Sequence, residues 1–170
     1  MSAGSDTIWV EPGTYTENIT MSGNKVVKSI LGPQRTIING NAADNVVQFN
    51  YLDSTAVLDG FTIMGGARGV NFERGGGIIR NCIIKKNQTG IWSIGSMVYT
   101  DPIIENNIIT ENTQYAMDTN NSWALLNKNT IANNAAGVKG YGFYSPSPTI
   151  VNCILWNNND DLVETGSAIY

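Results

Sequence analysis

The chain has 170 residues, of which 42% are hydrophobic, and both values are ordinary for one globular domain with a sizeable core. Its formal net charge of -4 argues against nucleic acid or an anionic membrane surface as a partner, because both need clustered Lys and Arg. The chain contains no His, which excludes His-ligated metal sites, Ser-His-Asp and Cys-His nucleophiles and an imidazole general base.

The N-terminal sequence shows no signal peptide, because it lacks the basic and apolar regions of one. No apolar run approaches the roughly 20 residues of a membrane span, so no span is predicted. A longer precursor could still have carried a signal. Residues 1–5 are expected to be a disordered terminus or a remnant left by expression, and residues 6–170 are expected to form one domain.

Three kinds of short β-rich segment then follow one another along the chain. The opening segments lie at 46–49, 69–72, 90–94, 115–119 and 137–141. The second segments lie at 56–60, 77–81, 102–106, 124–128 and 149–153. The third segments lie at 61–64, 82–86, 107–110, 129–132 and 153–156. They are rich in β-formers, are separated by Asn and Gly and lack helical spacing, so they predict strands, three to each repeat.

One nine-residue phrase recurs within these repeats, at residues 79–87, 104–112, 126–134 and 151–159. Its corner position is occupied in successive repeats by Gly60, Asn81, Asn106, Lys128 and Asn152. The corner residues are therefore 21, 25, 22 and 24 positions apart. A period of this length with variable insertions is typical of a solenoid, and Asn and Gly suit the positive φ of a sharp corner. A second Asn set is expected to mark the next corner: Asn87, Asn112, Asn134 and Asn158.

Alternation within the third segments assigns their two faces. The invariably apolar column is expected to point inward: Ile63, Ile84, Ile109, Ile131 and Leu155. The column two residues earlier shares its parity and should also face inward: Phe61, Cys82, Asn107, Asn129 and Cys153. Neighbouring Asn side chains in that column would stack as a buried amide ladder. The two cysteines are three coils apart, about 14 Å at strand spacing, which predicts free buried thiols.

A family resemblance extends this reading over residues 6–163. It is carried by DTIWVEPGTYTENITM at 6–21, TIINGN at 36–41, VVQF at 46–49, LDGFTIMGG at 58–66 and the Asn-rich coils that follow. These stretches resemble the right-handed parallel β-helix proteins of the pectin-lyase-like superfamily. The resemblance implies an all-β, right-handed parallel β-helix (solenoid) of about six to seven coils of three short strands, and an extracellular or cell-surface location. It assigns no function, because that fold carries many activities.

The enzyme patterns of this superfamily are broken in the chain. The Asp pair and the His of polygalacturonases have no match, since the only adjacent Asp residues are Asp160 and Asp161 and His is absent. The string YGFYSPSP at 141–148 resembles the Tyr-Gly-Phe-Asp-Pro-His motif of mannuronan epimerases, but Tyr144 and Ser145 replace its Asp and Pro. No three acids fall on one predicted face, as the calcium site of pectate lyases would need.

A binding groove is predicted along the opening strands. Their outward side chains are expected to be Asn71, Trp92, Met117 and Lys139, followed by Glu73, Ile94, Thr119 and Tyr141. The candidate substrate-binding residues are Asn71, Trp92, Lys139 and Tyr141, because aromatic rings beside polar groups suit sugar rings. Alternatively, the two aromatic side chains only pack under the neighbouring loops at 96–102 and 142–148. The acidic balance disfavours a polyuronate without calcium, so a neutral or weakly charged glycan is expected. No cofactor is expected, apart from calcium if the substrate is a polyuronate.

Acid catalysis would need two carboxylates, and the candidates are Glu73 and Asp118. They lie two coils apart, about 9.6 Å at strand spacing, which would suit an inverting glycosidase. However, parity turns Asp118 inward, so the pair would work only if a bulge redirected it. Two functions stay open: a non-catalytic repeat domain that binds a polysaccharide along its groove, and a lyase or glycoside hydrolase with atypical or missing catalytic residues.

The C-terminal stretch DLVETGSAIY at 161–170 begins another coil without a recognisable cap. Solenoids cover their terminal coils to protect the apolar core and the strand edges. The chain is therefore expected to be either part of a longer β-helix or a homo-oligomer whose copies stack end to end.

Overall fold

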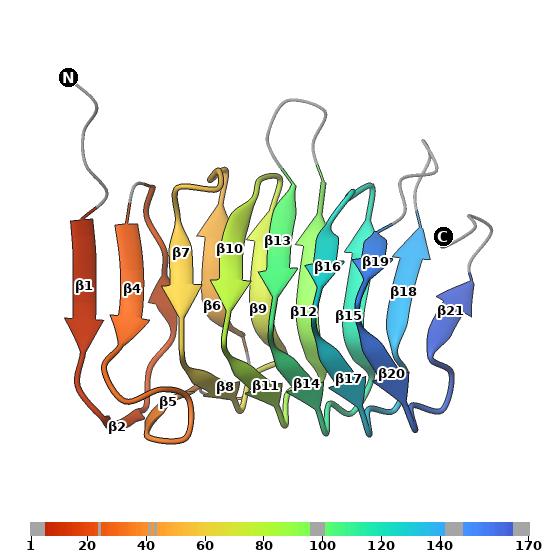
Figure 1. Ribbon diagram of the computed structural model, residues 1–170, viewed down its shortest axis with the longest axis horizontal. Helices are drawn as coiled ribbons and strands as arrows, with labels where there is room; N and C mark the ends of the chain where they lie inside the picture. Colours follow the sequence, from red (N-terminus) through yellow and green to blue (C-terminus); the bar gives the residue numbers. More distant parts are fainter. Residues whose placement is uncertain are drawn as a thin grey trace.

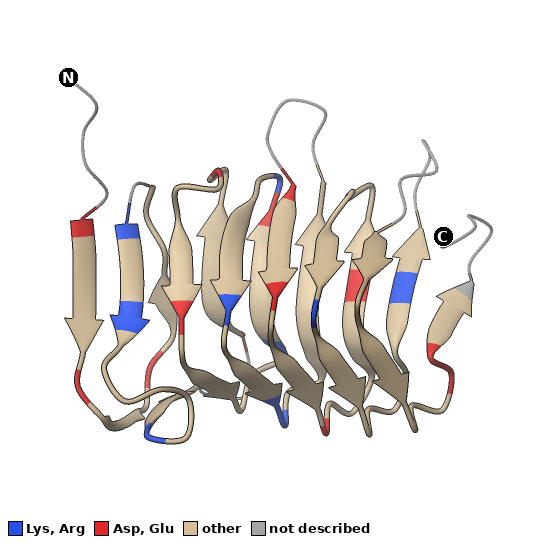
Figure 2. Ribbon diagram, in the orientation of Figure 1, with Lys and Arg blue, Asp and Glu red and all other residues tan. Residues whose placement is uncertain are grey.

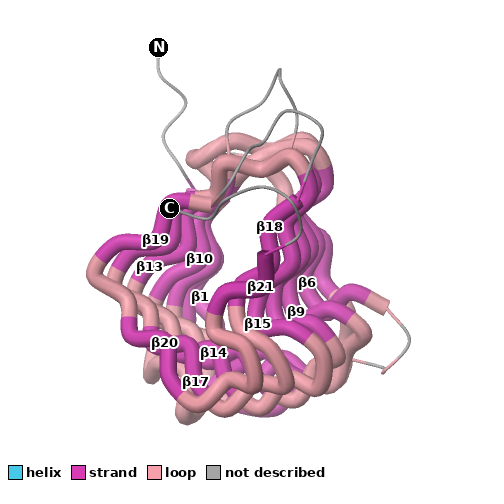
Figure 3. The backbone as a smooth tube through the Cα atoms, turned by 90° about the vertical axis from the view of Figure 1, so that its right-hand side faces the viewer, coloured by secondary structure: helices cyan, strands magenta, loops and turns pink. Residues whose placement is uncertain are grey.

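Three parallel sheets, here named A, B and C, run side by side along the long axis of the molecule (Figure 1). The computed structural model describes residues 6–23, 25–40, 42, 44–95, 101–141 and 148–164, and none of these is helical. Seen along the axis, the sheets form three sides of each coil (Figure 3). The predicted all-β solenoid with three strands per coil is confirmed.

Each coil passes through sheets A, B and C in that order. Sheet A contains β1 (Asp6–Val10), β4 (Lys25–Ser29), β7 (Val57–Asp59), β10 (Gly77–Arg80), β13 (Pro102–Glu105), β16 (Leu125–Asn127) and β19 (Thr149–Val151). Sheet B contains β2 (Gly13–Tyr15), β5 (Thr36–Asn39), β8 (Thr62–Met64), β11 (Ile83–Lys85), β14 (Ile108–Thr110), β17 (Thr130–Ala132) and β20 (Ile154–Trp156). Sheet C contains β3 (Ile19–Thr20), β6 (Asn45–Asn50), β9 (Arg68–Glu73), β12 (Thr89–Ile94), β15 (Tyr115–Asn120), β18 (Val138–Tyr141) and β21 (Leu162–Glu164).

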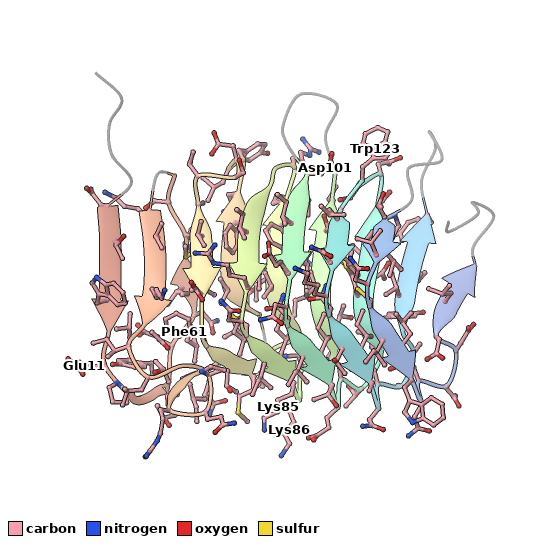
Figure 4. All side chains as sticks on the ribbon, viewed as in Figure 1. Glu11, Phe61, Lys85, Lys86, Asp101 and Trp123 are labelled. Atoms are coloured by element: carbon pink, nitrogen blue, oxygen red, sulfur yellow. The ribbon has the colours of Figure 1, made fainter. Side chains whose placement is uncertain are left out.

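The core is built from columns of like side chains stacked in register. In sheet B, Ile63, Ile84, Ile109 and Ile131 are direct partners from strand to strand, and all four are fully buried. Phe61 lies inside the coil one position before β8 (Figure 4). The predicted inward columns of the third segments are confirmed. Because equivalent apolar residues recur on every strand, each new coil extends one continuous core.

The corner between sheets A and B depends on left-handed backbone. The predicted corner residues all have positive φ: Gly60, Asn81, Asn106, Lys128 and Asn152. Among non-glycine residues, Asn enters this region at the lowest cost because its short polar side chain bonds locally. The predicted second corner is wrong by one residue, since positive φ falls on Lys86, Glu111, Asn133 and Asn157 instead.

The Asn residues that follow this second corner form a buried amide ladder. Nδ2 of Asn87, Asn112 and Asn134 each donates to Oδ1 of the next Asn, and Asn158 donates to Asp161. The predicted ladder is also present, because Asn107 Nδ2 donates to Asn129 Oδ1 at 3.1 Å. These ladders satisfy side chains that would otherwise be costly to bury.

The cysteines are free, as predicted. Cys82 is buried and Cys153 is half-buried. Burial raises the pKa of the Cys82 thiol to about 12, which makes it an inert core residue. Residues 1–5 and the predicted coil beyond residue 164 lie outside the described residues, so the domain limits and end-to-end assembly stay predictions.

Candidate functional site

A polar and aromatic column runs along the outer face of sheet C. Strand pairing aligns one outward residue from each of five neighbouring strands, β6 to β18: Gln48, Asn71, Trp92, Asp118 and Lys139. A second outward column lies two residues further along the same strands: Asn50, Glu73, Ile94, Asn120 and Tyr141. These two columns contain the four predicted binding residues and both predicted carboxylates.

The predicted faces of β15 are wrong. Met117 and Thr119 were expected to point outward, but both are fully buried, and Asp118 lies in the outward column between Trp92 and Lys139. The reason is the turn into sheet C, where β9 and β12 carry a glycine as their second residue and β15 carries Ala116. Because Ala116 replaces the recurring glycine, the start of β15 cannot be recognised from the sequence, and the strand is aligned one residue too early. A shift of one residue exchanges the two faces of a strand.

The predicted binding residues differ in how free their polar groups are. Asn71 is almost fully buried and its amide is committed, because it accepts a hydrogen bond from Arg68 and donates one to Gln48. Trp92 and Lys139 are half-buried in the same column, and Tyr141 is half-buried in the second column. The loops at 96–100 and 142–147 lie outside the described residues, so the alternative packing of the aromatics under those loops stays a prediction.

A polar cleft of about 340 Å³ opens at the end of sheet C where β9, β12 and β15 begin. Its walls come from four consecutive coils: Asp44, Asn45, Ala67, Arg68, Gln88, Thr89, Trp92, Gln114 and Asp118. Amide, hydroxyl, carboxylate, guanidinium and indole groups therefore converge on one space. This arrangement can form many hydrogen bonds to a ligand with several hydroxyl groups.

Two side chains of the cleft have a polar atom without a partner in the part of the chain that the structure describes. Within it, Trp92 Nε1 and Asp118 Oδ1 are buried and make no hydrogen bond. The two residues are direct partners on adjacent strands, and Asp118 as a whole is only 4% exposed. Because nearly all buried polar groups in proteins are hydrogen-bonded, two unpaired atoms on neighbouring residues mark this place as a functional candidate.

Cations cover the aromatic rings of this face. The guanidinium of Arg68 lies 4.3 Å from the centre of the Trp92 ring. The ammonium of Lys139 lies 4.8 Å from the ring centre of Tyr115 and 4.9 Å from that of Tyr141. These distances are those of cation–π contacts. The rings are therefore already engaged by the protein's own charges.

The ionisation of Asp118 reflects opposing influences. Desolvation by burial raises the pKa of its carboxyl group, and the positive charges of Lys139 and Arg68 counteract part of that rise. Lys139 Nζ lies 3.6 Å from Asp118 Oδ2, so one carboxylate oxygen has an ion-pair partner and the other has none. Burial is also the main cause that raises the pKa of the Tyr141 hydroxyl.

The predicted catalytic carboxylates are not brought together. Glu73 lies in the second column, two strands away from Asp118 and offset by two residues, or about 12 Å between Cα atoms at standard strand spacings. Glu73 has an ion-pair contact with Arg74 at 3.9 Å and does not line the cleft. Asp118 is therefore the carboxylate next to the indole, and Glu73 belongs to another part of the face.

Charges elsewhere on the surface alternate in sign. In sheet A the adjacent residues Lys28, Asp59, Arg80 and Glu105 form one outward column of alternating charge, whose red and blue bands are visible in Figure 2.

Within the described ranges there is no group of three or more His, Cys, Asp and Glu that could hold a metal ion. A search of those same residues finds no helix long and apolar enough to cross a membrane.

Comparison with family models identifies the repeat. A model described as the right-handed β-helix region matches residues 47–170, which is more than half of the chain. The chain belongs to this family. The comparisons with curated proteins and with solved structures found no match. The right-handed β-helix predicted from the Asn-rich repeats is thus established, and this finding is consistent with the predicted membership of the pectin-lyase-like superfamily.

Sequence reasoning missed several residues that line the cleft of this right-handed β-helix. Gln88 and Gln114 stand in equivalent positions just before β12 and β15, and the backbone N–H of Gln114 donates to the carbonyl of Gln88. A glutamine recurring directly before an opening strand was the available signal. Arg68 left no such signal, because its neighbours in the column are Asn45 and Thr89.

Proposed function

We propose that this right-handed β-helix is a non-catalytic domain that binds a polysaccharide along the outer face of sheet C. The observation that carries this proposal is the cleft at Trp92 and Asp118, where hydrogen-bonding side chains of four coils surround one space. Sugar sites combine aromatic side chains with a few fixed polar groups, and the cleft places the indole of Trp92 beside amide, hydroxyl and carboxylate groups. The long, regular face would let successive sugar units lie along successive coils.

The described side chains support binding more strongly than catalysis. A glycosidase of the common type needs two carboxylates about 5–10 Å apart on either side of the scissile bond. The cleft holds Asp118 and, at its far side, Asp44 on an exposed loop position. Glu73 lies outside the cleft. We infer that a bound glycan would be held and released unchanged.

Binding is tested first on a glycan array, with and without calcium, using the wild-type chain and the variants Trp92→Ala and Tyr141→Ala. We expect the wild type to bind at least one polysaccharide without calcium, and Trp92→Ala to reduce its affinity at least tenfold. The matched control is Trp156→Ala, because Trp156 is 70% exposed on sheet B and lies outside the proposed site.

Product analysis completes this test. Incubation with each bound polysaccharide should release no reducing ends and no unsaturated products. Circular dichroism of every variant must remain that of the wild type, so that lost binding is not mistaken for unfolding. Absence of binding to any glycan, or equal losses in Trp156→Ala and Trp92→Ala, would refute the proposed site.

A further inference from the structure

We propose that one hydroxyl group of an uncharged sugar bridges Trp92 Nε1 and Asp118 Oδ1 after the Arg68 side chain has moved off the indole. This inference rests on the proposed function and names the chemistry by which the same cleft would select its ligand. It concerns one pair of atoms and one moving side chain, and therefore makes predictions that glycan binding alone does not.

The two residues are neighbours, and their unpaired atoms have complementary needs. Trp92 and Asp118 are direct partners on the parallel strands β12 and β15, so their Cα atoms are about 5 Å apart and one bound group can lie against both side chains. Trp92 Nε1 is buried and unpaired, and so is Asp118 Oδ1. A buried donor and a buried acceptor without partners both carry a desolvation penalty, which a bridging group would remove.

A hydroxyl group fits this pair better than the other common functional groups of glycans. The indole N–H can only donate, and an ionised carboxylate can only accept. A hydroxyl oxygen accepts from the first while its own hydrogen is donated to the second. A uronic acid carboxylate could accept from the indole but would then face Asp118 with a like charge and no proton to donate, which disfavours polyuronates.

The usual stacking of a sugar on an aromatic ring is blocked at this site. Arg68 covers one face of the Trp92 ring at 4.3 Å and is held there by a hydrogen bond to Asn71. Lys139 lies between the rings of Tyr115 and Tyr141. Recognition of the hydroxyl would therefore use the edge of the indole and the carboxylate, while Lys139 keeps the ring faces of Tyr115 and Tyr141.

Access to the pair requires movement, because both unpaired atoms are closed off from solvent. Two long side chains lie against the pair, Arg68 on the indole and Lys139 beside the carboxylate. Arg68 also lines the cleft, and a hydrogen bond of 3.3 Å and a cation–π contact hold it, both of which are modest interactions. It is the side chain that the ligand would displace.

The test uses Trp92→Phe, which keeps a six-membered aromatic ring and removes the N–H. It also uses Asp118→Asn, which keeps the shape of the side chain and removes its charge. The matched controls are Trp156→Phe on sheet B and Glu105→Gln on sheet A. Isothermal titration with the neutral oligosaccharide found on the array should show a loss of about tenfold or more for each site variant and none for the controls. Trp92→Phe should still be fully folded at the urea concentrations that leave the wild type folded, because Nε1 has no hydrogen bond to lose among the described residues.

Monodeoxy analogues of that oligosaccharide identify the bridging hydroxyl. For the wild type, one analogue should bind about tenfold more weakly than the parent sugar. For Trp92→Phe and for Asp118→Asn, the same analogue and the parent sugar should bind with equal affinity. Arg68→Ala should bind the parent sugar with a faster association rate in a stopped-flow measurement, because the covering side chain is gone.

The outcomes separate this inference from the function on which it rests. Glycan binding that survives Trp92→Phe and Asp118→Asn, or binding of uronic acid oligosaccharides alone, would overturn the hydroxyl bridge and leave a glycan-binding face. A slower association with Arg68→Ala would overturn the displacement step. A wild-type chain that binds no glycan would overturn both proposals together.

Discussion

The surroundings of a side chain in this molecule depend on whether it lies on the inner or the outer face of its strand. Asp118 is the clearest case, since a shift of one position in register would have turned its carboxylate into the core, on the side that Met117 and Thr119 now occupy. On the outer face it meets Lys139 and the indole of Trp92 instead. Its burial there has a measurable consequence for stability.

The stability of the protein should depend on pH through Asp118. Because desolvation raises the pKa of this carboxyl in the folded state, the folded protein binds the proton more tightly than the unfolded chain does. The resulting stabilisation is fully present below the unfolded value, near pH 3.9, and is lost as pH rises through the raised folded value. We therefore expect the free energy of unfolding of Asp118→Asn, measured in urea between pH 3.5 and 8, to rise relative to that of the wild type as pH rises. The rise should be about 1.4 kcal/mol per unit of difference between the folded and the unfolded pKa.

Asp53 provides a control of opposite sign. Hydrogen bonds from Thr55 lower the pKa of the Asp53 carboxyl, so its stabilising contribution is present above the unfolded value and is lost as pH falls. The free energy of unfolding of Asp53→Asn should fall relative to that of the wild type as pH rises, with nearly all of the change below about pH 5. Parallel stability curves for Asp118→Asn and the wild type would contradict the assignment of Asp118 as a desolvated carboxylate.

At the level of strands and corners, the Asn ladders connect successive coils by hydrogen bonds. Each rung joins two coils through an amide–amide bond and a backbone N–H that donates to the same oxygen, as Asn87 does to Asn112 Oδ1. A rung thus fixes the distance and register between neighbouring corners. The ladder members are almost fully buried, so water cannot replace a missing rung.

Removal of one rung should be costly. Asn112→Ala would leave the backbone N–H of Asn87 without its acceptor, and would remove one hydrogen bond each from Asn87 Nδ2 and from the carbonyl of Ile84, in a buried corner. An orphaned buried donor costs about 1–3 kcal/mol and each lost hydrogen bond about 1 kcal/mol, so we expect urea unfolding to give a loss of about 3 kcal/mol or more. Asn127→Ala is the control, because Asn127 is half-buried on the outer face of sheet A and accepts from Asn152 at 3.2 Å. Its loss should stay below about 1 kcal/mol, and similar losses in both variants would show that the buried ladder has no special role.

Much of the fold could be predicted from such columns, and the limits of that prediction have physical causes. The inward isoleucines and the A–B corners repeat in nearly every coil, so one alignment revealed them all. The B–C ladder was mistaken for a corner because Asn suits both positive φ and buried amide stacking. The face of β15 was missed because Ala116 stands where other coils have glycine. The cleft depends on side-chain orientation at four coils, which spacing along the chain does not encode.

The whole molecule behaves as a stack in which each coil contacts only its neighbours, so stability should be distributed along the axis. Ile109 is fully buried between coils on both sides, whereas Leu155 lies in the last strand of sheet B and is half-buried. Trp123 and Asp101 lie where the chain passes from sheet C to sheet A (Figure 4), where Trp123 is exposed and its backbone N–H donates to the half-buried carboxylate of Asp101. Connections at this corner vary in length while the stacked strands keep their register.

Core truncation should therefore have effects that depend on the coil. We expect Ile109→Ala to lower the free energy of unfolding by about 3–5 kcal/mol, and Leu155→Ala by less than about 2 kcal/mol. Native-state hydrogen exchange should show that Leu155→Ala accelerates exchange mainly in β19 and β20, and Ile109→Ala in strands on both sides of β14. Uniform acceleration across all strands in both variants would mean that the stack unfolds as a single unit.

The amide ladders also have a direction. In each amide from Asn87 to Asn158, Oδ1 accepts from the preceding coil and Nδ2 also donates onward, and the final donor meets the carboxylate of Asp161 at 2.7 Å. The aligned amides therefore add up along the axis, much as peptide units do in a helix macrodipole, with the positive end at the later coils. Asp161 stands at that end as an acidic residue stands at a helix N-terminus. The corner between sheets B and C is thus electrically polarised along the axis over these coils.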